Sequence, residues 1–532
     1  MNRLVLLPAW VAALFAATCL LMTAARAADD LTQPIRVSPD GHFLTQPDGQ
    51  PFFWLGDTAW ALFARLTREE ADVYLQDRAA KGFNMVQAVA IGGPFDTLEV
   101  PNRYGELALI GKDPTRPNPK YFEHIDWVVE RAAQYGIRIA MLPVWGASLV
   151  GGLWSKEEIF TPATAQEYGR WIAQRYRGKG VVWILGGDTN PLWPKDLDFL
   201  AAAKGKASKP PDMTIIDYRP IYDAMAKGLL AGEGADPLIT FHPNPVSYSG
   251  TAHPRTSLYF RDRPWFGMNM LQSSHYANEA TTIFPWLLSD YTLLGPLNYQ
   301  AVRKEYDSTP VRPVVDGEPR YEGLPVDIKY DAKKGSWNAY DTRNAAYHAV
   351  FAGAAGHTFG NTSVHLSLDP SIREADKPIL KDYPDIGGTW REQLDSPGAR
   401  QMRHIKALML SRPYFTRIPD QSLIVGEAGE GEAHIGATRD KSGSYALVYL
   451  PQGQTVKVEM TRLSGTRAVG WWFDPRTGEA RRIAGLFATK GVTAFMPPSD
   501  GSEDDWVLVL DDEGMRFAAP GSLAITATAS RD

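Results

Sequence analysis

The chain has 532 residues, of which 44% are hydrophobic, 11% aromatic and 22% charged, and this composition excludes a disordered or fibrous protein. The length suggests two to four domains, or one large barrel with an additional domain. The net charge is −6 and no run of five basic residues occurs, so we expect no nucleic-acid partner.

The N-terminus has the pattern of an export signal. Arg3 precedes an apolar run from Leu4 to Met22, and Ala25-Arg26-Ala27 supplies the small residues that signal peptidase recognises. We expect cleavage after Ala27, which would also remove Cys19, the one cysteine of the chain. The mature protein would then be periplasmic or secreted, with no membrane span and no disulfide. The alternative is an uncleaved anchor, because about 19 apolar residues can just span a bilayer.

From Pro51 to about Ser411, short apolar runs alternate with helical patterns, as in a parallel sheet with crossover helices. No glycine-rich phosphate turn follows the first run, which favours a (β/α)8 TIM barrel over an open doubly wound sheet. The spacing of Thr67 and Glu70 predicts a capping box at the start of the first helix. The expected strands are 52–55, 85–90, 137–142, 181–185, 238–241, 266–271, 314–316 and 357–359, and the expected helices are 67–81, 121–135, 162–176, 220–230 and 340–355.

After Arg412-Pro413 the helical periodicity nearly disappears and strand-like segments recur. They predict a small antiparallel β-sandwich, with strands at 423–425, 444–449, 455–460, 468–473 and 506–510. The expected organisation is a signal peptide (1–27), a linker or strand (28–50), the barrel (51–415), the β-sandwich domain (416–515) and a flexible tail (516–532).

Two acidic residues follow expected barrel strands, at the end of the barrel where catalytic groups lie. Asp188 comes after an apolar strand and a Gly-Gly break, and Glu318 follows the strand 314–316. Glycoside hydrolysis needs such a pair: one carboxyl protonates the leaving oxygen while the other attacks or supports the anomeric carbon. Taken alone, Asp188 reads equally as a turn residue and Glu318 as a surface residue. Asp316 is the nearest competitor of Glu318.

Further polar and aromatic residues at or near strand ends are candidates for binding substrate, although the histidines are equally typical of hydrogen-bonded core positions. The ten histidines show no metal-ligand spacing, and the chain has no nucleophile elbow or phosphate-binding loop, so we expect no metal and no cofactor. The candidates are Asp57, Gln87, Trp145, Asn190, His242, Gln272, His275, Tyr276 and His357.

Five motifs occur in the order 50–60, 81–84, 185–188, 270–275 and 316–319. Together these motifs resemble the apiosidase-like glycoside hydrolases of family 140. The resemblance implies that Asp188 is the acid/base, that Glu318 is the nucleophile, and that the substrate contains the branched pentose apiose of plant pectin, notably of rhamnogalacturonan II. The clan usually has Asn-Glu where this family has the aspartate. The C-terminal part resembles the β-sandwich that often follows in this family, which is named for collagen binding.

We therefore expect a retaining glycoside hydrolase with an oligo- or polysaccharide substrate and with carboxyl groups about 5 to 5.5 Å apart. One alternative is a glycosidase of other specificity, acting on arabinofuranosides or β-glucans. The other is a secreted, non-catalytic protein that binds carbohydrate or matrix through its sandwich domain.

Overall fold

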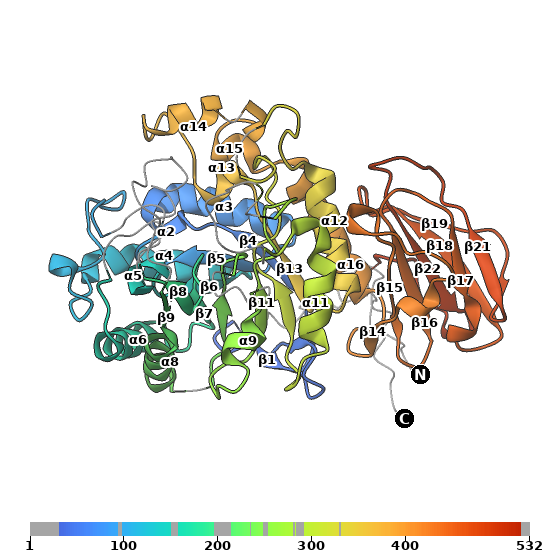
Figure 1. Cartoon of the computed structure of the whole chain (residues 1–532), viewed down its shortest axis with the longest axis horizontal. Helices are drawn as coiled ribbons and strands as arrows, with labels where there is room; N and C mark the ends of the chain where they lie inside the picture. The colour runs from blue at the N-terminus through green and yellow to red at the C-terminus, as the bar shows by residue number, and fades with distance from the viewer. Residues whose placement is uncertain are drawn as a thin grey trace, which may run out of the picture.

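The computed structural model describes residues 31–93, 98–150, 158–195, 214–234, 236–247, 254–279, 282, 292–328, 331–382 and 384–522. The expected signal peptide and Cys19 lie outside these residues. No helix within them has both the length and the apolar character needed to cross a membrane. Figure 1 shows a helix-rich part on the left and antiparallel sheets on the right.

The first part is a parallel barrel of eight strands in the order β10-β7-β6-β5-β4-β13-β12-β11. A bridge between Thr240 and Met268 joins the two end strands, and Thr240 Oγ1 donates a hydrogen bond to Met268 O at 2.7 Å. The expected (β/α)8 barrel is confirmed. Its strands are β4 (Trp54–Thr58), β5 (Met85–Val89), β6 (Arg138–Leu142), β7 (Val182–Gly186), β10 (Ile239–His242), β11 (Asn269–Leu271), β12 (Val314–Asp316) and β13 (Gly356–Phe359).

Helices surround these strands (Figure 1). The expected capping box is present, because Glu70 N donates to the Thr67 side chain and the Glu70 carboxylate accepts from Thr67 N. The main helices are α3 (Arg68–Ala80), α4 (Pro119–Gln134), α6 (Pro162–Tyr176), α8 (Arg219–Glu233), α11 (Asn298–Tyr306), α12 (Ala339–Phe351) and α16 (Pro397–Leu410). Shorter ones are α2 (Leu62–Arg65), α5 (Ala147–Val150), α9 (Thr256–Phe260), α13 (Thr362–His365), α14 (Asp376–Asp382) and α15 (Trp390–Gln393).

The expected first strand, 52–55, is divided between two sheets. Phe52 belongs to β3 (Pro51–Phe52), which joins β1 (Arg36–Val37) and β2 (Leu44–Thr45) in a three-stranded sheet, whereas Trp54 begins β4. Apolar residues of the small sheet, including Leu44 and Phe52, pack with Trp54 in the cluster that fills the barrel. The small sheet therefore contributes to the barrel core.

The second part is a two-layer β-sandwich, as expected. One sheet has the order β14-β15-β16-β22-β18-β19 with β20 beside β18, and the other pairs β17 with β21. The expected strand 423–425 is reduced to a single bridge between Ile424 and Val458. A 3-10 helix covers Gln421–Leu423, where the Asp420 carboxylate accepts from Ser422 N and turns the chain. The strands are β14 (Arg417–Pro419), β15 (Gly436–Asp440), β16 (Tyr445–Leu450), β17 (Val456–Glu459), β18 (Arg467–Phe473), β19 (Ala480–Arg482), β20 (Phe487–Ala488), β21 (Val492–Phe495) and β22 (Trp506–Asp512).

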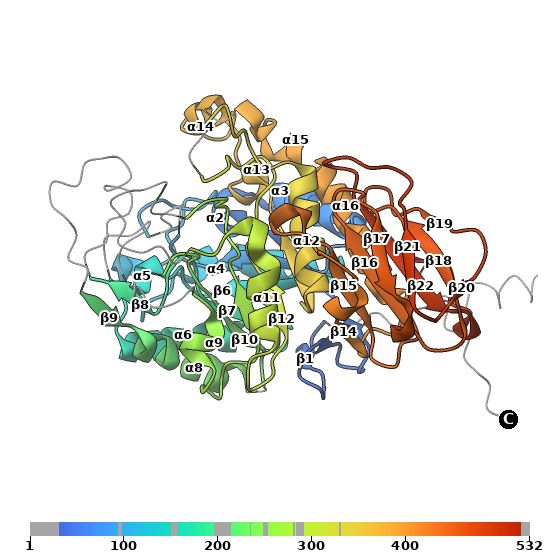
Figure 2. The same cartoon turned by 45° about the vertical axis from the view of Figure 1, so that its right-hand side comes forward.

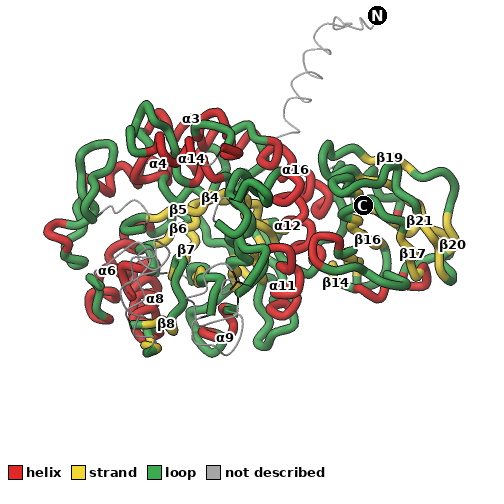
Figure 3. The backbone as a smooth tube through the Cα atoms, turned by 45° about the horizontal axis from the view of Figure 1, so that its top comes forward, coloured by secondary structure: helices red, strands yellow, loops and turns green. Residues whose placement is uncertain are grey.

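Helices α12 and α16 lie between the barrel and the sandwich (Figures 2 and 3). One hydrophobic cluster includes Phe351 of α12, Met402 of α16, and Tyr449 and Val509 of the sandwich. Phe517, in the expected tail, also packs against this cluster. The sandwich thus shares its buried surface with the barrel and is built as a fixed part of it.

A buried ion pair crosses this interface. Arg343 of α12 donates two hydrogen bonds, of 2.8 and 2.7 Å, to the carboxylate of Asp505 in the sandwich. The side chains are 3% and 0% exposed. Gln401 Oε1, on α16, accepts a third hydrogen bond from Arg343. The guanidinium charge is therefore compensated by acceptors from both domains.

Asp505→Ala is expected to lower the free energy of unfolding by about 3 to 5 kcal/mol, because it leaves the Arg343 charge buried and unpaired. Denaturant unfolding of the whole chain measures this. The control is Glu374→Ala, which removes an exposed ion pair with Lys377, since the Lys377 and Glu374 side chains are 60% and 83% exposed. This variant should lower the free energy of unfolding by under about 1 kcal/mol. Equal losses in the two variants would show that the buried pair does not hold the domains.

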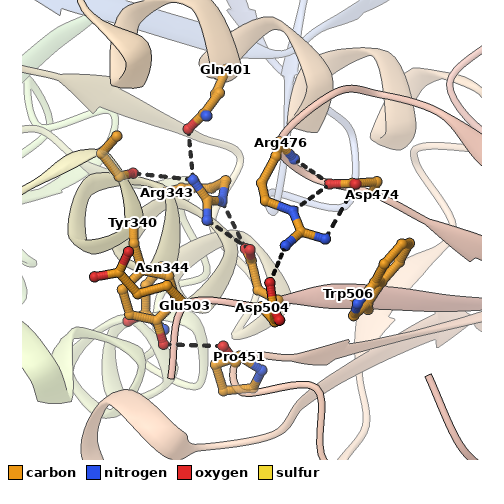
Figure 4. Close-up of polar contacts among 12 residues, drawn as sticks. Tyr340, Arg343, Asn344, Gln401, Pro451, Asp474, Arg476, Glu503, Asp504 and Trp506 are labelled. Carbon is orange, nitrogen blue, oxygen red and sulfur yellow. Dashed lines mark hydrogen bonds and ion pairs between the residues drawn. The ribbon is translucent and has the colours of Figure 1, made fainter. Parts of the chain in front are cut away.

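A cavity of about 580 Å³ also lies at the interface, between the loop after β12, α12, α16 and the sandwich. The two arginines that line it already have acidic partners (Figure 4). Arg343 pairs with Asp505, and Arg476 pairs with Asp474 and Asp504. These guanidinium groups therefore connect protein segments to one another across the cavity wall.

Candidate active site

The turn after β7 determines where Asp188 lies. Gly186, Gly187 and Asp188 are all left-handed, with φ of 85°, 106° and 49°. A Cβ at Gly186 would lie 2.4 Å from His242 O. A Cβ at Gly187 would lie 2.8 Å from the ring of Trp145. Glycine is therefore required twice, and the strained, half-buried Asp188 that follows has a backbone conformation that is common at functional sites.

Asp188 and Glu318 are each held by polar side chains, two of which come from the segment after β11. Gln272 Nε2 donates to Asp188 Oδ1 at 2.8 Å. His275 Nε2 lies 3.1 Å from Glu318 Oε1. His242 Nε2, at the end of β10, lies 2.8 Å from Glu318 Oε2. The structure thus brings together both expected carboxylates and three of the expected binding residues.

The surroundings of the two carboxyl groups shift their pKa values in opposite directions. Burial raises the pKa of Asp188 to about 6, and the charge of Glu318 adds to this, against smaller opposing effects of His242 and Gln272. Burial also raises the pKa of Glu318, but the hydrogen bonds and charges of His242 and His275 outweigh it, so the net pKa is well below its ordinary value. One group keeps its proton in mildly acidic solution while the other is ionised.

Two further candidates line the barrel interior near the pair. Gln87 Nε2 donates to the carbonyl of Gly317 at 2.8 Å, immediately before Glu318. Trp145 is 1% exposed and packs edge-on against Trp60, with 5.4 Å between ring centroids. The Trp60 ring lies 5.6 Å from that of His242. Gln87 and Trp145 therefore support the site and, within the described residues, neither presents an open face.

Tyr276 and Asn190 contact the surroundings of Asp188. Burial raises the pKa of the Tyr276 hydroxyl, and the nearby charge of Asp188 contributes in the same direction. Asn190 Oδ1 accepts from Asn244 N at 3.1 Å, and Asn244 Nδ2 donates to the carbonyl of Asp188 at 3.1 Å. Asn190 is therefore linked to the backbone of Asp188 through Asn244, on the loop after β10.

The structure does not bring Asp57 or His357 to the carboxylate pair. Asp57 Oδ2 accepts from the Tyr74 hydroxyl at 2.6 Å and lies 3.2 Å from Arg78 Nε, both on helix α3. Neither ring nitrogen of His357 has a hydrogen-bond partner in the described part of the chain, and burial lowers its pKa to about 3. Both residues lie on the outward face of their strands, because alternate residues of a strand point to opposite faces.

Tyr321, which the sequence analysis did not propose, lies at the site. Tyr321 is 1% exposed and its ring lies 4.5 Å from that of His275 and 4.8 Å from that of His365. Burial and the charge of Glu318 raise the pKa of the Tyr321 hydroxyl. The same strand-end rule would have found Tyr321, since it is three residues beyond Glu318.

The described residues contain no group of three or more His, Cys, Asp or Glu side chains that could hold a metal ion. The groups present are two carboxyls of different pKa, imidazoles, amides and aromatic rings. Such carboxyls can transfer protons and attack an electrophilic carbon.

Comparison with known proteins agrees with this chemistry. A family model described as "Apiosidase-like, catalytic domain" matches residues 38–416, and one described as "Putative collagen-binding domain of a collagenase" matches residues 418–511. A solved glycoside hydrolase is 29% identical, over 91% of this chain and 98% of that one, with a TM-score of 0.75. A glycoside hydrolase family 5 structure from Bacteroides vulgatus is 28% identical, over 93% of this chain and 96% of that one, also with a TM-score of 0.75. A search of curated proteins gave no match.

The barrel, its carboxylate pair and these similarities define a glycoside hydrolase, whose substrate is a carbohydrate. The chain belongs to the apiosidase-like catalytic-domain family. The resemblance drawn from the five sequence motifs is confirmed, and the catalytic-domain match favours an enzyme over a non-catalytic binding protein.

Proposed function

We propose that this protein is a retaining glycoside hydrolase that acts on apiose-containing, pectin-type glycans. Glu318 is the nucleophile and Asp188 is the acid/base. These roles rest on one observation, that the two carboxyl groups have different surroundings. Two imidazoles favour the ionised form of Glu318, whereas burial and the charge of Glu318 favour the protonated form of Asp188.

The reaction proceeds by two displacements. Glu318 attacks the anomeric carbon while Asp188 gives its proton to the glycosidic oxygen, so the carbon–oxygen bond breaks and an alcohol leaves. Asp188, now ionised, then takes a proton from water as the water oxygen attacks the same carbon and releases Glu318. His242 and His275 stabilise the Glu318 carboxylate before attack and after release.

Family membership supports apiose as the sugar recognised. The test is sugar release from rhamnogalacturonan II fragments that contain apiose, beside arabinofuranosides and β-glucans as competing substrates. We expect release of apiose-linked sugars at a kcat/KM well above that for arabinofuranosides and β-glucans. Faster hydrolysis of an arabinofuranoside or a β-glucan would assign another specificity to the same site.

The stereochemistry gives a separate test of the mechanism. Nuclear magnetic resonance of the first-formed sugar should show the anomeric configuration of the substrate, because two displacements retain it. Release of the opposite anomer would mean that a water molecule attacks directly and that Glu318 acts as its base.

We also propose that the protein is exported. The apolar run from Leu4 to Met22 and the sequence Ala25-Arg26-Ala27 support export. N-terminal sequencing of the protein from a native-type bacterial host should begin at Ala28. A chain that keeps Met1 and sediments with membranes would instead support an uncleaved anchor.

A further inference from the structure

Asp316 lies behind the site rather than in it. Its neighbour Val315 packs in the barrel interior, so the Asp316 side chain points outward, toward α11. There its Oδ2 accepts hydrogen bonds from Ser273 Oγ at 2.8 Å and from Asn298 Nδ2 at 3.1 Å. Asn298 is itself fixed, because Nδ2 also donates to Ala345 O at 2.8 Å. All three polar residues are at most 1% exposed.

Ser273 belongs to the short segment that holds both carboxylates. Gln272, immediately before it, contacts Asp188, and His275, two residues after it, contacts Glu318. The conformation of this segment is unusual, since Ser274 has φ of 93° without being glycine. Such a conformation persists only where surrounding contacts impose it.

Backbone hydrogen bonds join this segment to the end of β12. Gly317 N and Glu318 N both donate to Leu271 O, at 2.8 and 3.2 Å, and Ser274 N donates to Glu318 O at 3.4 Å. The bond from Ser273 to Asp316 adds a side-chain contact to this junction, beside that of His275 with Glu318. It links Glu318's own strand to the segment that carries Gln272 and His275.

We propose that Ser273 and Asp316 are positioning residues, which fix Gln272 and His275 together and thereby hold the acid/base and the nucleophile in register. This inference rests on the proposed roles of Asp188 and Glu318. A single anchor then governs both carboxylates, so its loss disturbs both at once. Misplacement of reacting groups by about 1 Å can reduce turnover about 100-fold.

The test is Ser273→Ala, with kcat, KM and the pH profile of kcat/KM measured on one defined substrate. We expect kcat to fall about 10- to 100-fold with KM changed less than threefold. Gln272 lowers the pKa of Asp188, and His275 lowers that of Glu318. Loss of both contacts should therefore move both limbs of the pH profile to higher pH.

Ser396→Ala is the matched control, because Ser396 is also buried and also donates to a carboxylate, that of Glu322, on the loop after β12. It should lose comparable stability and leave both limbs in place. Asp316→Asn keeps an acceptor oxygen for Ser273 and should retain most of kcat, whereas Asp316→Ala should resemble Ser273→Ala. Denaturant unfolding of each variant separates loss of positioning from loss of fold.

Carbon-13 titration of the Asp188 and Glu318 carboxyls, in wild type and Ser273→Ala, measures the two pKa values without any substrate. Upward shifts of both pKa values support the anchor. Unchanged titration together with a kcat within twofold of wild type would overturn it, whatever the Glu318 variants show. Full turnover by Glu318→Gln would overturn the proposed catalytic roles, and the titration would still decide on the anchor.

Discussion

Glu318→Gln is expected to reduce kcat by about four orders of magnitude or more, the scale seen when an enzyme loses its nucleophile. The amide has nearly the volume of the carboxylate, so His242 and His275 keep a similar partner and the fold is unchanged. What is lost is the anionic oxygen that attacks the anomeric carbon. KM should change little, because ground-state contacts with the sugar remain.

Single-turnover and steady-state rates on an apiose-containing substrate measure this effect. The matched control is Glu322→Gln, on the same loop after β12. Glu322 is also buried, but Ser396 Oγ and Gly398 N hold its carboxylate on the side that faces α16. It should keep kcat within about tenfold of wild type. If the Glu322 variant lost turnover and the Glu318 variant kept it, the nucleophile would have been assigned to the wrong residue.

Most of the barrel could be predicted because its strands are buried on both faces. They are therefore largely apolar runs, and β4, β7, β10 and β12 end at a glycine or a polar residue. The Gly-Gly-Asp sequence was informative for a steric reason that the structure supplies: any Cβ at Gly186 or Gly187 would strike His242 or Trp145. The sequence pattern thus located Asp188 correctly at a strand end.

Which face a strand-end residue points to could not be predicted. Asp57 and Gln87 both lie in barrel strands, yet Asp57 contacts α3 and Gln87 crosses the interior. A shift of one residue reverses the face, and the exact strand boundaries are what sequence patterns determine least well. Asp57 and His357 were proposed as binding residues because the face to which their side chains point was not known. Tyr321 was missed because it lies three residues beyond Glu318, in the loop after β12.

In the sandwich, strands β14, β15, β19, β20 and β21 were not predicted. Strand β15, Gly436–Asp440, and β19, Ala480–Arg482, have too few apolar residues to show alternation. Their place is fixed by backbone pairing with β16 and β18. The central strands β16 and β22 are buried along nearly their whole length and were predicted within two residues. Tertiary pairing, rather than local pattern, defines strands β15 and β19.

Asp188→Asn should lower kcat by about 10²- to 10⁴-fold on natural glycosides, the usual contribution of a general acid. The asparagine cannot donate the proton that the leaving alcohol needs. It keeps the turn geometry, because asparagine tolerates the left-handed backbone that Asp188 adopts. Aryl glycosides with acidic phenols leave without protonation, so the first displacement on them should stay within about tenfold of wild type. An equal loss on both substrate types would contradict the acid role.

The pH profile tests the same assignment independently of leaving group. Asp188 must be protonated to donate, and its pKa is raised to about 6, so wild-type kcat/KM should fall as pH rises through about 6. Glu318 must be ionised, and its pKa is lowered, so the acid limb should lie below the ordinary pKa of a glutamate. In Asp188→Asn the alkaline limb should disappear while the acid limb stays in place, because Asp188 is already protonated and uncharged at the pH where Glu318 titrates. A retained limb near pH 6 would assign that titration to another group.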